Sequence, residues 1–214
     1  MTQILLKMRI AFCLSIILFV SSCDLDIMDK LKPKAIVNGI TLNHKGEMSI
    51  SMVYSSDILS LELKSSSVLL KGRASKKINI RIEYWEFEPG DAIIRLEDSS
   101  LVTSSISGKP VLISSVSGLY PDDIDYDVSV TNGDIEIVSM RSNSIKAFSG
   151  NGTISLNDSN VFNLSAKSET GDLEAYNSAI HTAVMETGTG NIILNNTKIK
   201  KRNINNGTGK LKEY

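Results

Sequence analysis

The chain has 214 residues, of which 42% are hydrophobic and 22% are charged, and its 23 basic and 24 acidic side chains leave a formal net charge of −1 at pH 7. This length is sufficient for one sizeable core. The charge balance does not favour nucleic acid as a partner, because domains that bind nucleic acid are usually strongly basic.

Residues 1–22 have the layout of a bacterial signal peptide that is cleaved from the mature chain. Two basic residues precede an apolar run over 10–20, which is too short for a comfortable membrane span. The run ends in Val-Ser-Ser-Cys, which resembles a relaxed lipobox, so we predict that Cys23 carries palmitate or a similar lipid and anchors the protein to a membrane. The alternative is an ordinary secretory signal cleaved near Ser22. No disulfide framework is expected, because the other cysteine lies within the apolar run.

Residues 23–35 indicate a charged tether, and residues 36–127 contain a series of short strand candidates without helical periodicity. The candidates span 36–42, 47–53, 58–63, 68–70, 78–87, 92–96, 101–106 and 111–116. The stretch 89–93, Pro-Gly-Asp-Ala-Ile, is similar to a degenerate copy of the repeated motif described next. Because a clean period is missing, we expect irregular coils or a cap in this half of the chain.

Residues 128–214 repeat every 19 residues. The repeated glycines are at positions 133, 152, 171, 190 and 209, and each is followed two residues later by Ile or Leu. Apolar and polar residues alternate after each glycine, which is the period of a strand, and Asn, Asp, Ser and Thr between the apolar segments suit tight turns. A unit this short buries its apolar face only by stacking on copies of itself.

We therefore predict an all-β fold, a single-domain parallel β-solenoid with 19-residue coils in 128–214, each holding two or three short strands. The repeated glycine is expected to supply a positive φ. Asparagines at the corners are candidates for hydrogen-bonded ladders up the stack, namely Asn151, Asn177, Asn195 and Asn196.

The lead-in Leu119-Tyr120-Pro121, the segment Val128–Ile137 and the corner copies at 170–173 and 189–192 resemble the bacterial putative-adhesin family of β-solenoid domains. That family shows a Pro-containing lead-in, a strand, and then repeated Gly-[Asp/Asn]-[Ile/Leu] corners. The resemblance covers about residues 36–214. It implies a solenoid fold and a role in adhesion, and it implies no catalytic residue.

Neither a metal site nor a catalytic constellation emerges from the sequence. Asp134 and Asp172 follow corner glycines, but the other three corners lack a carboxylate there, so a role in the turn is favoured over a calcium site. His44 and His181 are far apart in the sequence and are expected on the surface. The alternating aspartates in 123–127 suit a solvated acidic edge, or the carboxylate array of a polysaccharide-active enzyme.

Two groups of residues are candidate ligand contacts. Trp85 lies in an aromatic, strand-like run, where it would stack on a sugar ring or pack against the core. The last coils are basic, through Lys198, Lys200, Lys201 and Arg202. This basic group would bind an anionic glycan or phosphate head groups, or would protect a terminal strand edge from pairing with another chain.

These observations favour a cell-envelope lipoprotein whose solenoid is a non-catalytic adhesion or binding module. We expect a location at the outer membrane or cell surface, with a periplasm-facing position as the alternative. The expected partners are the membrane, through the lipid, and a glycan or a host or matrix protein, with no cofactor, metal or nucleic acid. A polysaccharide-active β-helix enzyme and a structural or sensory envelope component are the rival functions, since fold does not imply function.

Overall fold

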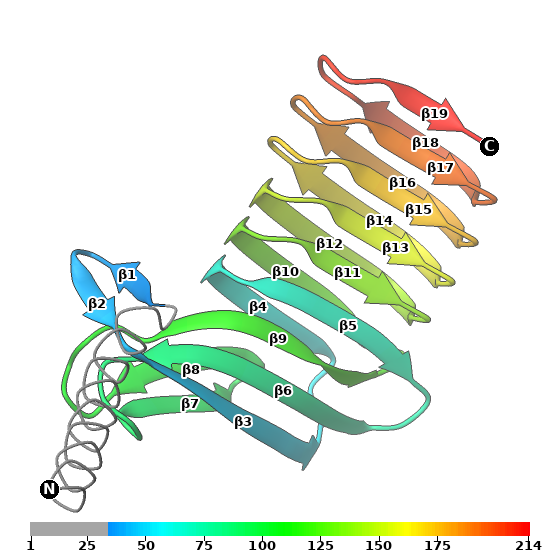
Figure 1. Ribbon diagram of the computed structural model, residues 1–214. Coiled ribbons are helices and arrows are strands. Elements are labelled where there is room, and N and C mark those ends of the chain that lie inside the picture. Colours follow the sequence, from blue (N-terminus) through cyan, green and yellow to red (C-terminus); the bar gives the residue numbers. More distant parts are fainter. Residues whose placement is uncertain (1–33) are drawn as a thin grey trace, which may run out of the picture. The chain divides into compact units, whose positions relative to one another are not determined.

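The computed structural model describes residues 34–214 (Figure 1). The signal peptide, Cys23 and nearly all of the tether lie outside the described residues. Residues 36–214 form one compact unit. The part of the chain that is described holds no helix long and apolar enough to cross a membrane.

Each 19-residue coil contributes one long and one short strand to two different sheets, which confirms the predicted parallel solenoid. The long strands belong to an eight-stranded sheet, sheet 1, and the short ones to a nine-stranded sheet, sheet 2. The long strands are β10 (Asp125–Asn132), β12 (Arg141–Asn151), β14 (Asn160–Ser168), β16 (Ala179–Thr187) and β18 (Lys198–Asn205). The short strands are β11 (Ile135–Val138), β13 (Ile154–Asn157), β15 (Leu173–Tyr176), β17 (Ile192–Asn195) and β19 (Leu211–Glu213).

The core consists of apolar columns that run through the stack between the two sheets. Parallel pairing places each residue beside the one 19 positions further on. In the column that follows the corner glycines every member is at most 3% exposed, namely Ile135, Ile154, Leu173 and Ile192. Val161 and Ile180 form part of a buried column from sheet 1. The alternation predicted from the sequence is thus the alternation between core and solvent.

The corner glycines are required because successive coils approach each other very closely. A Cβ on Gly171 would lie 1.9 Å from the carbonyl oxygen of Gly152, and one on Gly190 would lie 2.0 Å from that of Gly171. Positive φ values occur only at Gly133 and Gly152, at 145° and 159°. The prediction that every corner glycine supplies a positive φ is therefore wrong for the last three, where the neighbouring backbone excludes a side chain.

The left-handed residues occupy the opposite corner, where each short strand leads into the next long strand. They are Ser139, Asp158, Asn177 and Asn196, with φ of 46–53°. These residue types tolerate the left-handed region better than most. Asn196 Nδ2 donates to Asn177 Oδ1 at 2.9 Å, and at the glycine corner Asn151 Nδ2 donates to Asn132 Oδ1 at 2.7 Å. The predicted asparagine ladders are thus confirmed at positions 151, 177 and 196.

The strands of the N-terminal half lie close to the predicted segments. They are β1 (Ala35–Val37), β2 (Ile40–Leu42), β3 (His44–Val53), β4 (Ile58–Ser65), β5 (Ser67–Arg73), β6 (Lys77–Glu86), β7 (Ala92–Glu97), β8 (Ser100–Ser105) and β9 (Leu112–Pro121). The candidate at 36–42 is divided by a turn at Asn38-Gly39, after which β2 pairs with β1.

One regular coil is hidden in this half. Strand β4 pairs in parallel with β10, and β5 with β11, so that Leu61 is the register partner of Val128 and Val68 that of Ile135. The offset is 67 residues instead of 19, and serines at 65–67 replace the glycine motif. Residues 58–73 are therefore the first coil of the solenoid, although a long excursion separates them from the second.

The excursion forms the cap (Figure 1). Strand β9 returns parallel to β5, and β6 and β3 then extend sheet 2 in antiparallel fashion. The hairpin β7–β8 completes sheet 1 beside β4. The stretch 89–93 makes the turn into this hairpin, with the amide of Asp91 donating to the carbonyl of Glu88. Its interpretation as a copy of the solenoid corner is wrong, because no coil stacks on it.

Candidate ligand-binding site

A groove of about 660 Å³ crosses the outer face of sheet 1 near the left-handed corner. It extends over four successive long strands, from β12 to β18. The side chains that matter for binding are Arg141, Asn143, Asn160, Phe162, His181, Lys198 and Lys200. None of these residues was placed next to another by composition alone, so the stacking of coils builds the site.

Two columns of side chains run along the groove. Successive register partners in the first column are Arg141, Asn160, Ala179 and Lys198. The second column lies two positions further along each strand and contains Asn143, Phe162, His181 and Lys200. Neighbouring strands are about 4.8 Å apart, so each column presents one side chain at every such step.

Phe162 and His181 form an exposed aromatic stack in the second column. Their ring centroids are 4.3 Å apart and their planes differ by 16°. Phe162 is nevertheless 50% exposed, because only one of its faces is covered by His181. The next residue along the column on the other side is Asn143, whose side chain is much shorter. A flat apolar surface is thus held open toward the first part of the groove.

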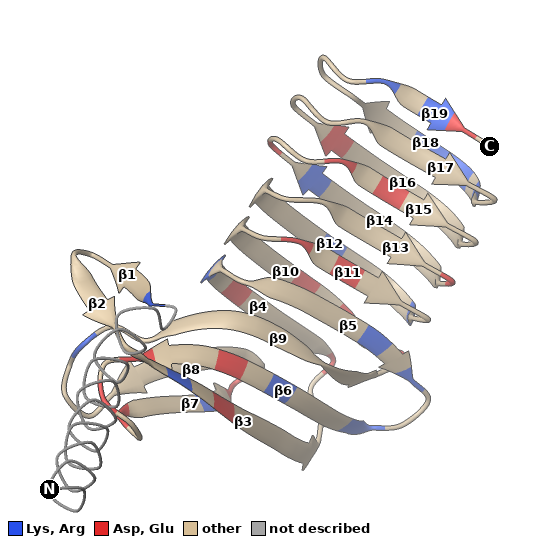
Figure 2. Cartoon of the chain, viewed as in Figure 1, with Lys and Arg blue, Asp and Glu red and all other residues tan. Residues whose placement is uncertain are grey.

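The groove is positively charged although the chain as a whole is slightly acidic. Arg141, Lys198 and Lys200 line it together with a single carboxylate, Asp123. Within residues 34–214 the three cations take part in no ion pair, whereas other basic residues do. Figure 2 shows basic segments on β18 and β19, at the C-terminal end of the stack.

Of the predicted basic contacts, Lys198 and Lys200 line the groove, and Lys201 lies outside its lining. Lys201 continues a neighbouring column on sheet 1, beside Thr182. Arg202 follows Ala183 in a core column, and its guanidinium forms an ion pair with Glu213, which follows Leu194 in a core column of sheet 2. Two apolar columns thus end in opposite charges that join the sheets across the last coil.

The structure separates Trp85 from the basic group. Trp85 is half-buried on β6, between Lys45 of β3 and Leu112 of β9, in the cap. In sheet 2, strands β9, β5, β11, β13, β15 and β17 lie between β6 and β19. The two groups of predicted contacts therefore cannot form one site.

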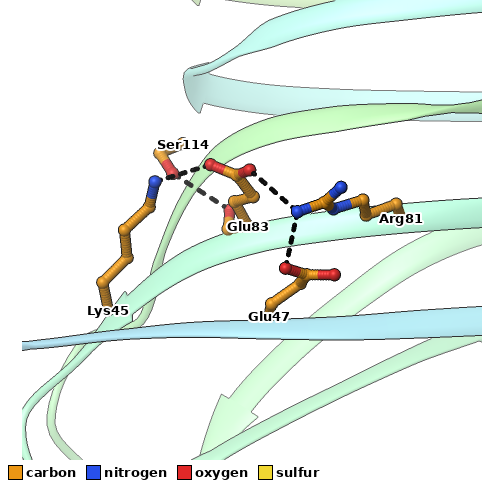
Figure 3. A network of polar contacts seen from close by, with 5 residues as sticks. All are labelled: Lys45, Glu47, Arg81, Glu83 and Ser114. Atoms are coloured by element: carbon orange, nitrogen blue, oxygen red, sulfur yellow. Dashed lines mark hydrogen bonds and ion pairs between the residues drawn. The ribbon is translucent and has the colours of Figure 1, made fainter.

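Near Trp85 the surface carries an ion-pair network between β3 and β6 (Figure 3). Lys45 Nζ lies 2.6 Å from Glu83 Oε2, and Arg81 Nη2 lies 2.7 Å from Glu47 Oε2 and 3.7 Å from Glu83 Oε1. The hydrogen bond and charge of Lys45 lower the pKa of Glu83. All four side chains are substantially exposed, so the network contributes little stability and offers no unpaired charge to a ligand.

The aspartates that follow corner glycines bind the next coil. Asp134 Oδ1 accepts a hydrogen bond from the amide of Thr153 at 2.8 Å, and Asp172 Oδ1 accepts one from the amide of Asn191 at 2.7 Å. This is the turn role that the sequence favoured. In the described part of the chain no group of three or more His, Cys, Asp and Glu side chains is arranged to hold a metal ion.

Sequence reasoning missed Phe162 and Arg141. The signal was present in the 19-residue alignment, because Phe162 stands at an outward position one repeat before His181. It was not recognised because single exposed aromatic residues are common and carry no meaning without a neighbour.

Comparison with known proteins supports the fold. The family model described as Toastrack DUF4097 matches residues 24–213. The crystal structure of a putative cell adhesion protein from Clostridium sporogenes is similar with a TM-score of 0.50 at 13% identity, covering 79% of this chain and 99% of that one. A putative adhesin from Bacteroides fragilis gives a TM-score of 0.44 at 11% identity, with 79% and 97% covered. Among curated proteins nothing matches this sequence.

Proposed function

This chain belongs to the Toastrack DUF4097 family, and from that premise we propose that it is a non-catalytic binding module of the bacterial cell envelope. It adheres to its ligand through the groove on the outer face of sheet 1. A lipid on Cys23 holds it to the membrane, and the charged residues that follow provide the tether to the folded unit. The favoured location is the outer membrane or cell surface.

The observation that carries this proposal is the half-exposed Phe162 stacked on His181 within a groove. Leaving a large aromatic ring in water is unfavourable, and covering it with a ligand recovers that cost. The ring is also held in place by the stack and by regular strand pairing on both sides, so little conformational freedom is lost on binding.

The groove suits binding better than hydrolysis. Hydrolysis of a glycosidic bond ordinarily uses two carboxyl groups on opposite sides of the bond, and the groove is lined by one, Asp123. The two following aspartates, Asp125 and Asp127, stand in other columns, where their neighbours in β12 are Ser144 and Lys146. The solved protein from Clostridium sporogenes is described as a cell adhesion protein, which agrees with a binding role.

The experiment follows the protein in living cells. Bacteria expressing the wild type, Cys23→Ala or Cys13→Ala are labelled with palmitate, treated with protease from outside, and assayed for adherence. We expect labelling and adherence to vanish only in Cys23→Ala, and protease to reach the labelled protein. Cys13→Ala is the matched control, because that cysteine lies within the expected signal peptide. A labelled protein that protease cannot reach would refute the adhesion proposal and indicate a periplasm-facing role.

A further inference from the structure

Building on the proposed function, we propose that the groove on sheet 1 binds a glycan that contains acidic sugar residues. One pyranose ring lies against the free face of Phe162, and acid groups of the glycan lie against Arg141, Lys198 and Lys200. The proposal deepens the binding role by naming the class of ligand and the side chains that recognise it.

The aromatic stack selects a flat, partly apolar ligand. One face of Phe162 is covered by His181, and the other is open above Asn143. The C–H face of a pyranose ring fits such a surface, since it is apolar while its hydroxyl groups project from the rim. The ring hydroxyls then reach the side-chain amides of Asn143 and Asn160, which line the same groove.

The charges select an acidic ligand. Three cationic side chains face one carboxylate, so the lining carries a net positive charge. The cations are also distributed along the groove, because Arg141 lies at its β12 end and the two lysines lie on β18, three strands away. A ligand with one acid group would reach only one end. A chain of acidic sugars would contact both, with an acid group near each end.

The repeat of the protein matches that of a polysaccharide. Each coil advances the groove by about 4.8 Å, which is close to the length that one pyranose ring adds to an extended glycan. A second hollow, of about 640 Å³, shares Arg141, Asn160, Ala179 and Lys198 with the groove and continues it over the left-handed corner. There the asparagines at 177 and 196 provide further amide groups for hydroxyl recognition.

The test measures binding of the full-length chain, purified in mild detergent, to immobilised polygalacturonate, heparin and dextran. We expect binding to the two acidic glycans, weakened by salt, and little binding to neutral dextran. Phe162→Ala should weaken acidic glycan binding at least about tenfold, and Phe162→Tyr should retain it, because tyrosine preserves the stacking surface. The double variant Lys198→Gln/Lys200→Gln should also lose at least about tenfold.

The matched control is Lys64→Gln/Lys71→Gln, which removes two exposed lysines outside the groove and changes the net charge equally. It should bind as the wild type does. Equal losses in both double variants, or equal binding of dextran and acidic glycans, would overturn the proposal. Glycan binding that ignores all groove variants would overturn the site. Adherence of cells without any glycan binding would overturn the ligand class while leaving the proposed function intact. Thermal unfolding checks that each variant is folded.

Discussion

Replacing Gly171 with alanine tests the reason for the repeated glycine. The added Cβ would lie 1.9 Å from the carbonyl oxygen of Gly152, whereas real Cβ atoms essentially never come closer than 3.0 Å to such an atom. The two coils would have to separate by about 1.1 Å at this corner. The obstacle is backbone, and Ser168 binds it from the side, since its hydroxyl donates to Gly152 O at 2.9 Å and accepts from Gly171 N at 2.8 Å.

The expected cost follows from the rigidity of that obstacle. Overpacking in a well-packed interior usually costs about 1–3 kcal/mol, and we expect the upper end of this range because no flexible side chain can give way. For a chain of this size each 1 kcal/mol lowers the melting temperature by about 2–4 °C, so Gly171→Ala should melt about 6–12 °C lower than the wild type.

Gly108→Ala is the matched control, because Gly108 has a φ of +72° but nothing within 4 Å of the added Cβ. It carries only the penalty of a left-handed non-glycine residue, about 1 kcal/mol, or about 2–4 °C. Melting followed by circular dichroism compares the two variants. The reasoning is refuted if Gly108→Ala is destabilised as much as Gly171→Ala, since the glycine would then serve conformation and not close approach.

Two further predictions concern charged groups. Replacing Arg202 and Glu213 together by leucine should make the chain self-associate with increasing concentration in size-exclusion chromatography, because two core columns would end in exposed apolar side chains; a monomer at all concentrations would contradict this. Hydrogen bonds from the hydroxyl and the amide of Ser107 lower the pKa of Asp91. The stabilisation is therefore complete above the unfolded value of about 3.9 and is lost as the pH falls through the lower folded value. Urea unfolding of Asp91→Asn should show a smaller loss of stability on acidification below about pH 4 than the wild type, and identical pH profiles would show that the carboxylate is not stabilised there.

Much of the solenoid was predictable because its pairing is local. In residues 128–214 every coil stacks on the segment 19 residues away, so the identity of one coil repeats in the next and the apolar columns are visible in an alignment of the chain with itself. The asparagine ladders at positions 151, 177 and 196 follow from the same register. Most strand positions of the N-terminal half were also predictable from alternation and turn residues.

The coil at 58–73 could not be predicted, because its partner lies 67 residues away and serines replace the diagnostic glycine. No local pattern distinguishes a strand that joins a parallel stack from one that pairs in antiparallel fashion, as β6 and β9 do. The lipobox and the tether concern residues outside the described part, so the anchor at Cys23 rests on sequence alone.

The amino-acid pattern was thus sufficient to define the 19-residue coil, its core columns and its corner residues, because these depend on contacts that recur at a constant separation along the chain. Only tertiary structure could decide which outward side chains share a groove and which do not. Arg141 and Lys198 meet in one groove because four strands stack in exact register, and Phe162 becomes a binding surface because His181 covers only one of its faces. Trp85, equally suggestive in the sequence, is carried to the cap by antiparallel pairing with β3 and β9.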